Sequence, residues 1–299
     1  TSLCQCVGVT SSALGDGVGP LQGEYGLGLD QIVSARLVLA DGTAPDLLWA
    51  LKGAGQNFGI VTEMKLRVYE NKGKEDWALV VLIFSQDKPE DVFEALNKKL
   101  PGQPNHLSYD FLLAMASILC WLAPNFSGYP HSSFLFQRFQ PGRDLLASFH
   151  GNSPNALSRR HRSTSVRVDI SHLHSWPLRG SPWYRCQKVR AVRHAQLLNL
   201  FNEATRAVPE FGVSYAFIES YATQAVRAIP AKSAAFARRH LNTLITDVLM
   251  YDAPSQNLAL DKLAHEWGEK IHSAVLEHQE RQESYDYSVK QESLEAMYG

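Results

Sequence analysis

The stretch GDGVGPLQGEYGLGLDQIVSARLVLADG (residues 15–42), followed after two residues by PDLLWALKGAGQNFGIVTEMKLRVYE (residues 45–70), decides the fold of this chain. Its glycines form three clusters, namely Gly15/Gly17/Gly19, Gly23/Gly26/Gly28 and Gly53/Gly55/Gly59. Glycine at this density marks loops in which the backbone takes a positive φ or in which another group approaches the main chain closely. We therefore expect three tight loops, with regular elements between them.

The order of these elements excludes a nicotinamide dinucleotide fold. That fold needs a strand, then G-x-G-x-x-G, then a helix whose N-terminus meets the pyrophosphate. Here the run from Gly53 to Gly59 follows a predicted helix and leads into a strand, and Pro20 stands where the first cluster would need its third glycine. The glycines must serve another architecture.

Hydrophobic periodicity predicts two strands and a helix in this stretch. Apolar residues alternate over Ile32–Ala40 and again over Gly59–Tyr69, which indicates two half-buried strands. Pro45–Gly53 has a proline at its start and a glycine at its end, as helices do. We expect the two strands to lie in one sheet, with the helix between them in the chain.

Further elements are expected along the rest of the chain. Strands are predicted over Trp77–Ser85, Leu107–Met115, Val213–Ser220 and Leu241–Tyr251. Helices are predicted over Pro89–Leu100, Ala195–Ala207 and Leu258–His278, the last with an apolar stripe at helical spacing.

Four motifs follow one another in fixed order near the N-terminus. They are Cys4-Gln-Cys-Val-Gly8; Leu14-Gly15 with Gly17, Gly19, Leu21, Tyr25-Gly26-Leu27 and Asp30; Ser34 with Ala40-Asp41-Gly42; and Pro45-Asp46-Leu47, Trp49-Ala50-Leu51, Gly53, Gly55 and Asn57-Phe58-Gly59-Ile60-Val61-Thr62. In this order they resemble the PCMH-type FAD-binding domain of the berberine-bridge-enzyme-like oxidoreductases, in the vanillyl-alcohol-oxidase superfamily, and the fungal branch matches best. The family's A-F-P-x-R motif is echoed by Ala235-Phe236-Ala237-Arg238-Arg239.

The resemblance implies an α+β fold. Part of a PCMH-type FAD-binding domain would be joined to a substrate domain that has an antiparallel sheet covered by helices. We place the FAD-binding part at residues 1–70, the substrate domain at residues 71–283 and a return segment to the FAD domain at residues 284–299.

The resemblance also implies the cofactor FAD. Cys4 aligns with the cysteine that some members bond to the flavin ring. The R-x-G-G-H loop whose histidine usually carries the flavin is absent from this sequence, so we expect weak, non-covalent binding. The cofactor-binding candidates are Cys4, Val7, Gly8, Gly15, Gly17, Gly19, Gly59, Ile60, Val61 and Asp286.

The catalytic candidates lie near the C-terminus, where the family carries Y-x-N-Y. This chain has Ser284 in place of the first tyrosine and Asp286 in place of the asparagine, so that Tyr285 and Tyr287 are the catalytic candidates. A tyrosine can take a proton from a substrate hydroxyl if its pKa is lowered, while the flavin accepts hydride. The alternative is that both tyrosines are structural.

Two functions follow from the resemblance. The first is an FAD-dependent oxidoreductase that oxidises a small secondary metabolite, alcohol or sugar, with molecular oxygen as the electron acceptor. The second is a truncated, catalytically inactive remnant that acts as a binding or scaffold protein.

The composition of the chain limits which classes of binding partner are expected. The 29 basic and 30 acidic residues nearly balance, which favours neither nucleic acid nor a membrane surface as a partner. No apolar run reaches the length of a membrane span. The chain begins at Thr1 within a motif and shows no targeting segment, which leaves the compartment open between secreted and cytoplasmic.

Residues 145–190 are rich in basic residues and serine and lack the apolar periodicity of the rest of the chain. We expect this segment to be irregular and poorly packed. Arg159-Arg-His-Arg162 favours a solvated loop over a nucleic-acid site, because no basic helix or aromatic pattern accompanies it. A stretch translated in a shifted frame is a further interpretation. His172 and His174 have no second ligand pair near them in the sequence, so no metal site is expected.

Overall fold

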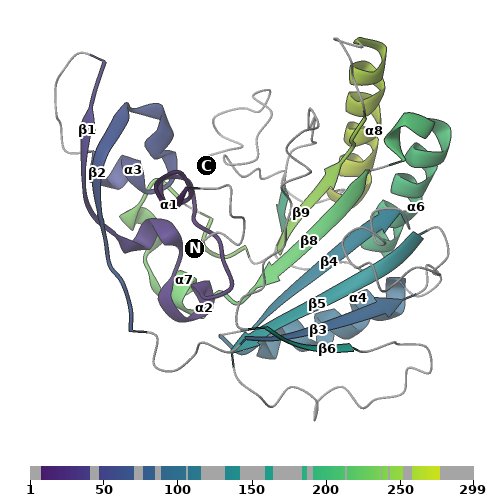
Figure 1. Ribbon diagram of the computed structural model, residues 1–299, viewed down its shortest axis with the longest axis horizontal. Helices are drawn as coiled ribbons and strands as arrows, with labels where there is room; N and C mark the ends of the chain where they lie inside the picture. Colours follow the sequence, from purple (N-terminus) through teal and green to yellow (C-terminus); the bar gives the residue numbers. More distant parts are fainter. Residues whose placement is uncertain are drawn as a thin grey trace.

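The computed structural model describes residues 8–40, 47–70, 77–84, 89–105, 107–115, 132–141, 159–163, 184–186, 191–212, 214–236, 238–241, 243–251 and 258–276. Their elements form two groups (Figure 1). One is an N-terminal unit of residues 8–70, and the other is a large antiparallel sheet with helices on one face. The predicted α+β fold class is confirmed.

The N-terminal unit contains a two-stranded antiparallel sheet, as predicted. Its strands pair from Ile32 opposite Leu66 to Val38 opposite Ile60. Both strands are shorter than predicted, because the residues beyond Val38 and Leu66 leave the ladder. The unit comprises α1 (Val9–Leu14), α2 (Gln22–Tyr25), η1 (Gly28–Gln31), β1 (Ile32–Val38), α3 (Leu48–Ala54), η2 (Gly55–Asn57) and β2 (Ile60–Leu66).

The large sheet has seven described strands in the order β6-β3-β5-β4-β8-β9-β7. Every neighbouring pair is antiparallel. The predicted strands correspond to β3, β4, β8 and β9, with ends that differ by a few residues. The bounds are β3 (Trp77–Phe84), β4 (Ser108–Met115), β5 (Ser132–Pro141), β6 (Arg159–Ser163), β7 (Tyr184–Cys186), β8 (Tyr215–Tyr221) and β9 (Thr243–Val248).

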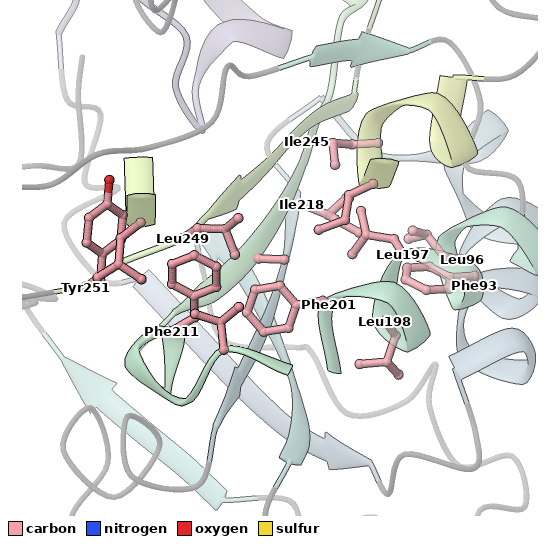
Figure 2. Close-up of a cluster of buried hydrophobic side chains, with 14 of the residues drawn as sticks. Phe93, Leu96, Leu197, Leu198, Phe201, Phe211, Ile218, Ile245, Leu249 and Tyr251 are labelled. Carbon is pink, nitrogen blue, oxygen red and sulfur yellow. The ribbon is translucent and has the colours of Figure 1, made fainter. Parts of the chain in front are cut away.

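Three predicted helices cover one face of this sheet: α4 (Pro89–Lys99), α6 (Ala191–Ala207) and α8 (Leu258–Leu276). Two short 3-10 turns, η3 (Leu100–Gly102) and η6 (Pro209–Phe211), follow α4 and α6. The apolar stripes of α4, α6 and α8 meet the sheet in one core (Figure 2). This burial of one side of each helix explains why the helical periodicity was readable in the sequence. The core includes Phe93, Leu96, Leu197, Phe201, Phe211, Ala216, Ile218, Ile245, Leu249 and Ile271.

The connection between β8 and β9 leaves the sheet and packs into the N-terminal unit. We call residues 222–241 the arm; it carries α7 (Gln224–Ala228) and η7 (Ala231–Ser233). Figure 1 shows α7 among the purple N-terminal elements. The arm completes a second small core, made of Leu27, Leu29, Val226 and Ala234 with Val18 and Phe236 against it. A segment of the predicted substrate domain therefore packs against the N-terminal unit and shares a core with it.

The expectation of a solvated loop at residues 159–162 is wrong. Arg159–Ser163 forms β6, which pairs with β3 from Trp77 opposite Ser163 to Val81 opposite Arg159. A strand is held by its backbone ladder, so a basic sequence without apolar alternation can still pair at the border of a sheet. Most of residues 145–190 lie outside the described part of the chain. No helix among the described residues is long and apolar enough to cross a membrane.

Candidate functional site

Strand β8 presents different residues to the two faces of the large sheet. Successive side chains of a strand point to opposite faces, and Ala216 and Ile218 belong to the core beneath the helices. The alternate residues therefore lie on the face that the helices leave uncovered, and Figure 1 shows the N-terminal unit on that side. These residues are Tyr215, Phe217, Glu219 and Tyr221.

Glu219 and Tyr221 form a buried polar pair on this uncovered face. Glu219 is 9% exposed and Tyr221 is 4% exposed. The Tyr221 hydroxyl donates a hydrogen bond of 2.7 Å to Glu219 Oε1. Burying a carboxylate is costly unless hydrogen bonds compensate it, so the phenol stabilises the carboxylate in this position. A carboxylate held in this way can accept a proton.

The end of β8 is held by hydrogen bonds from the Gln103 side chain and by packing against α2. Gln103 Nε2 donates to the carbonyls of Leu107 and Ser220, at 2.6 Å and 3.3 Å. Just beyond β8, Ala222 lies against Gly23 of α2: a Cβ added to Gly23 would be 2.5 Å from the Ala222 Cβ and 2.2 Å from the Asn105 carbonyl oxygen. The strand that carries Glu219 therefore ends in direct contact with the N-terminal unit.

Tyr215 begins β8 on the same face as Glu219. Burial raises the pKa of Tyr215 above its ordinary value of about 10. Its phenol is therefore protonated throughout the neutral range, where it acts as a hydrogen-bond donor or acceptor and carries no charge.

The predicted cofactor residues of the first glycine cluster are committed to contacts within the chain. Gly15, Gly17 and Gly19 are buried. Gly17 has a φ of 66°, and a Cβ there would lie 2.4 Å from the Gly28 Cα. The Gly19 amide donates to Gln22 Oε1 at 3.4 Å. Two backbone segments cross at Gly17 and Gly28, which explains the glycines structurally; a cofactor contact by this cluster stays a prediction.

The other two predicted cofactor stretches differ in how open their main chain is. Among the described residues, a Cβ added to Gly8 would come no closer than 3.7 Å to another atom, the Ser11 Oγ. At Gly59 an added Cβ would lie 2.3 Å from the Val38 carbonyl oxygen, so this glycine serves the contact with the end of β1, although Gly59 is solvent-exposed and Ile60 is 73% exposed. Because Leu14 of α1 packs on Gly55 just before β2, both stretches belong to one packed unit. The residues present fit one edge of a nucleotide cofactor, with room for a ring or phosphate against the backbone at Gly8.

The remaining predicted site residues lie outside the described part of the chain. They are Cys4, Val7, Tyr285, Asp286 and Tyr287. Their predicted roles stay predictions.

Sequence reasoning missed Glu219, although a signal for it existed. The predicted strand over Val213–Ser220 reads V-S-Y-A-F-I-E-S, and glutamate is its one acidic residue. A charge inside an otherwise apolar strand is costly to bury without a function or a partner. No spacing to a second carboxylate or a histidine marked it, because its partner is a tyrosine two residues further on.

Comparison with known proteins finds relatives over the whole chain, although no family model matches it. FAD-linked oxidoreductase anuG of Penicillium roqueforti is 31% identical over all of this chain and 62% of its own length. FAD-linked oxidoreductase chry5 of Gibberella zeae is 33% identical over 93% of this chain and 57% of its own length. The chain thus spans about three fifths of the length of the curated relatives it matches.

Solved structures show the same fold. The wild-type berberine bridge enzyme-like protein 1 of Physcomitrella patens superposes with a TM-score of 0.72 at 19% identity, over 100% of this chain and 66% of that one. A chitooligosaccharide oxidase gives a TM-score of 0.72 at 14% identity, over 97% of this chain and 64% of that one. The fold is that of the berberine bridge enzyme-like proteins. Over its whole length the chain is thus similar to curated FAD-linked oxidoreductases, and it has the berberine bridge enzyme-like fold.

Proposed function

We propose that the chain functions in an FAD-dependent oxidoreductase that oxidises a small organic molecule. A bound FAD supplies the two-electron chemistry by accepting hydride from the substrate carbon. One observation carries the proposal: Glu219 is a buried carboxylate on β8, a strand whose end contacts the N-terminal unit at Gly23. The chain's full-length similarity to FAD-linked oxidoreductases supports it.

In this proposal Glu219 takes a proton from a substrate hydroxyl. A carboxylate has two oxygens with about four acceptor positions, so Glu219 can accept from Tyr221 and from a substrate at once. The Tyr221 hydrogen bond holds the carboxylate in one orientation, and the buried setting excludes water from the proton transfer. Loss of the hydroxyl proton to Glu219, together with loss of hydride from the carbon that bears the hydroxyl, converts the substrate into a carbonyl product.

The cofactor would lie between the N-terminal unit and the uncovered face of the large sheet. Gly8, with the first turn of α1, and Gly59–Val61 would hold it by the main chain, without a covalent bond. The substrate class is an alcohol, a sugar or a secondary metabolite with an oxidisable hydroxyl-bearing carbon, and molecular oxygen would take up the electrons.

Flavin binding and reduction test this function. The purified chain is mixed with FAD, and the quenching of flavin fluorescence gives the dissociation constant. Anaerobic mixing with panels of alcohols and sugars then follows the loss of the oxidised flavin absorbance. Saturable binding and reduction by a member of the panel would support the proposal. A chain that binds no FAD would instead favour the inactive remnant.

A further inference from the structure

A buried ion pair joins the arm to the N-terminal unit. Arg239 donates from Nη1 to Asp30 Oδ2 at 2.9 Å and from Nη2 to Asp30 Oδ1 at 2.7 Å. The two side chains are 4% and 6% exposed. Paired parallel hydrogen bonds between a guanidinium and a carboxylate fix direction as well as distance. The arm is therefore docked at a defined angle, not only held nearby.

The pair is built for geometry more than for stability. Taking two charges out of water costs free energy that their attraction repays only when all their hydrogen bonds are made. Here Arg239 Nε is buried without a hydrogen-bond partner among the described residues. A buried donor left unsatisfied destabilises the folded chain. An apolar contact would stabilise the same interface at a lower cost, but it would not fix an orientation.

Contacts lead from this pair to the first glycine cluster. Asp30 Oδ2 also accepts the Leu27 amide at 2.9 Å. The next residue, Gly28, donates its amide to the Gly17 carbonyl at 2.9 Å, at the crossing where neither glycine tolerates a Cβ. The position of Asp30 thus sets the position of the predicted cofactor loop.

In the other direction the chain leads from Arg239 toward the buried carboxylate. Arg239 lies four residues before β9, and within the ladder Leu244 of β9 stands opposite Glu219 of β8. The arm that carries Arg239 therefore joins the loop predicted to meet FAD to the strand that pairs with Glu219. The two residues also end two of the motifs that carry the family resemblance, Tyr25-Gly26-Leu27-x-x-Asp30 and Ala235-Phe236-x-x-Arg239.

We propose that Arg239 is a positioning residue: through Asp30 it fixes the Gly17–Gly28 crossing, and so the distance between the cofactor loop and Glu219. This inference rests on the proposed FAD-dependent function for its consequence, but the mechanical part can be tested without cofactor. Lysine at position 239 would keep the charge and lose the two parallel hydrogen bonds.

The test compares Arg239→Lys with a matched control, Arg36→Lys. Arg36 pairs with Glu63 at 3.2 Å in the same unit, but the two side chains are 76% and 46% exposed. Amide hydrogen exchange is measured on both full-length variants without cofactor. We expect Arg239→Lys to accelerate exchange at Leu27 and Gly28 by about tenfold, with the amides of α6 unchanged, because the loop opens locally. Unchanged exchange at Leu27 and Gly28, or equal acceleration in α6, would overturn the proposal.

FAD affinity supplies the second readout. We expect Arg239→Lys and Asp30→Asn each to raise the FAD dissociation constant by about tenfold, and the double variant to be no weaker than the weaker single variant. Arg36→Lys should bind like the wild type. Wild-type affinity in Arg239→Lys would overturn the positioning role, whereas a wild-type chain that binds no FAD would instead refute the proposed function.

Discussion

Tyr221 and Glu219 stand two residues apart on β8, and the tyrosine hydroxyl donates to the carboxylate across 2.7 Å. Residues two apart on a strand share a face, so the pair is a product of strand geometry. Both side chains are buried although neither faces the hydrophobic core. This combination distinguishes them from the other polar residues of the strand.

The first prediction concerns Glu219 as the proton acceptor. Glu219→Gln keeps the size of the side chain and removes its basicity. We expect flavin reduction by substrate to slow by about 100- to 10,000-fold, with FAD affinity unchanged. Stopped-flow absorbance measures the reduction, and Glu203→Gln, an exposed carboxylate that pairs with Lys270, is the control. Reduction at the wild-type rate in Glu219→Gln would refute the assignment.

The second prediction compares Glu219 with the terminal tyrosines. A carboxylate is a base at neutral pH, whereas a phenol must first have its pKa lowered from about 10. We therefore expect Tyr285→Phe and Tyr287→Phe each to slow flavin reduction less than Glu219→Gln does. The same stopped-flow measurement decides it. A loss as large as that of Glu219→Gln in either variant would return the proton-accepting role to that tyrosine.

Much of the fold could be predicted because burial leaves a periodic trace. The apolar stripe of α8 was readable because one side of the helix packs into the core. The alternation in β1 and β2 predicted strands correctly but overstated their burial, because only Ile32 of the two strands is buried. β6 was not readable, since Arg159–Ser163 owes its strand conformation to pairing with β3, a contact that is distant in sequence.

The site was less predictable, for a physical reason. Glycine clusters signal close approach, but not what approaches: at Gly23 it is Asn105 and Ala222, and at Gly53 it is Phe236. The sequence therefore indicated tight loops correctly and gave no sign that the arm would fill part of them. Glu219 was missed for a different reason: its only signal was one charge inside a largely apolar strand, with no spacing pattern to point to a site.

The third prediction tests the contact between the two groups of elements. In Gly23→Ala the new methyl would overlap the Asn105 carbonyl and the Ala222 Cβ. Because backbone must move to make room, we expect a loss of about 1–3 kcal/mol in the free energy of unfolding. Urea titration followed by tryptophan fluorescence measures it.

Gly102→Ala is the matched control for this substitution. Gly102 is exposed in η3, and an added Cβ there meets no atom of the described residues within 4 Å. Its free energy of unfolding should stay within about 0.5 kcal/mol of the wild type. Equal urea midpoints for the two variants would mean that the contact at Gly23 does not limit stability.

The last prediction concerns Tyr215 and alkaline pH. Burial raises the pKa of Tyr215 above about 10, so the folded chain holds the phenolic proton more tightly than the unfolded chain does. Below the unfolded pKa both states are protonated, and the contribution of Tyr215 to stability does not vary with pH. As the pH rises from about 10 toward the folded pKa, the unfolded state releases its proton first, so this contribution is progressively lost.

We therefore expect the difference in free energy of unfolding between wild type and Tyr215→Phe to be constant at neutral pH and to shift against the wild type at alkaline pH. Urea titrations of both proteins at matched pH values measure it, and the comparison cancels every other titrating group. A difference that stays constant through the alkaline range would show that Tyr215 ionises as easily in the folded chain as in the unfolded one.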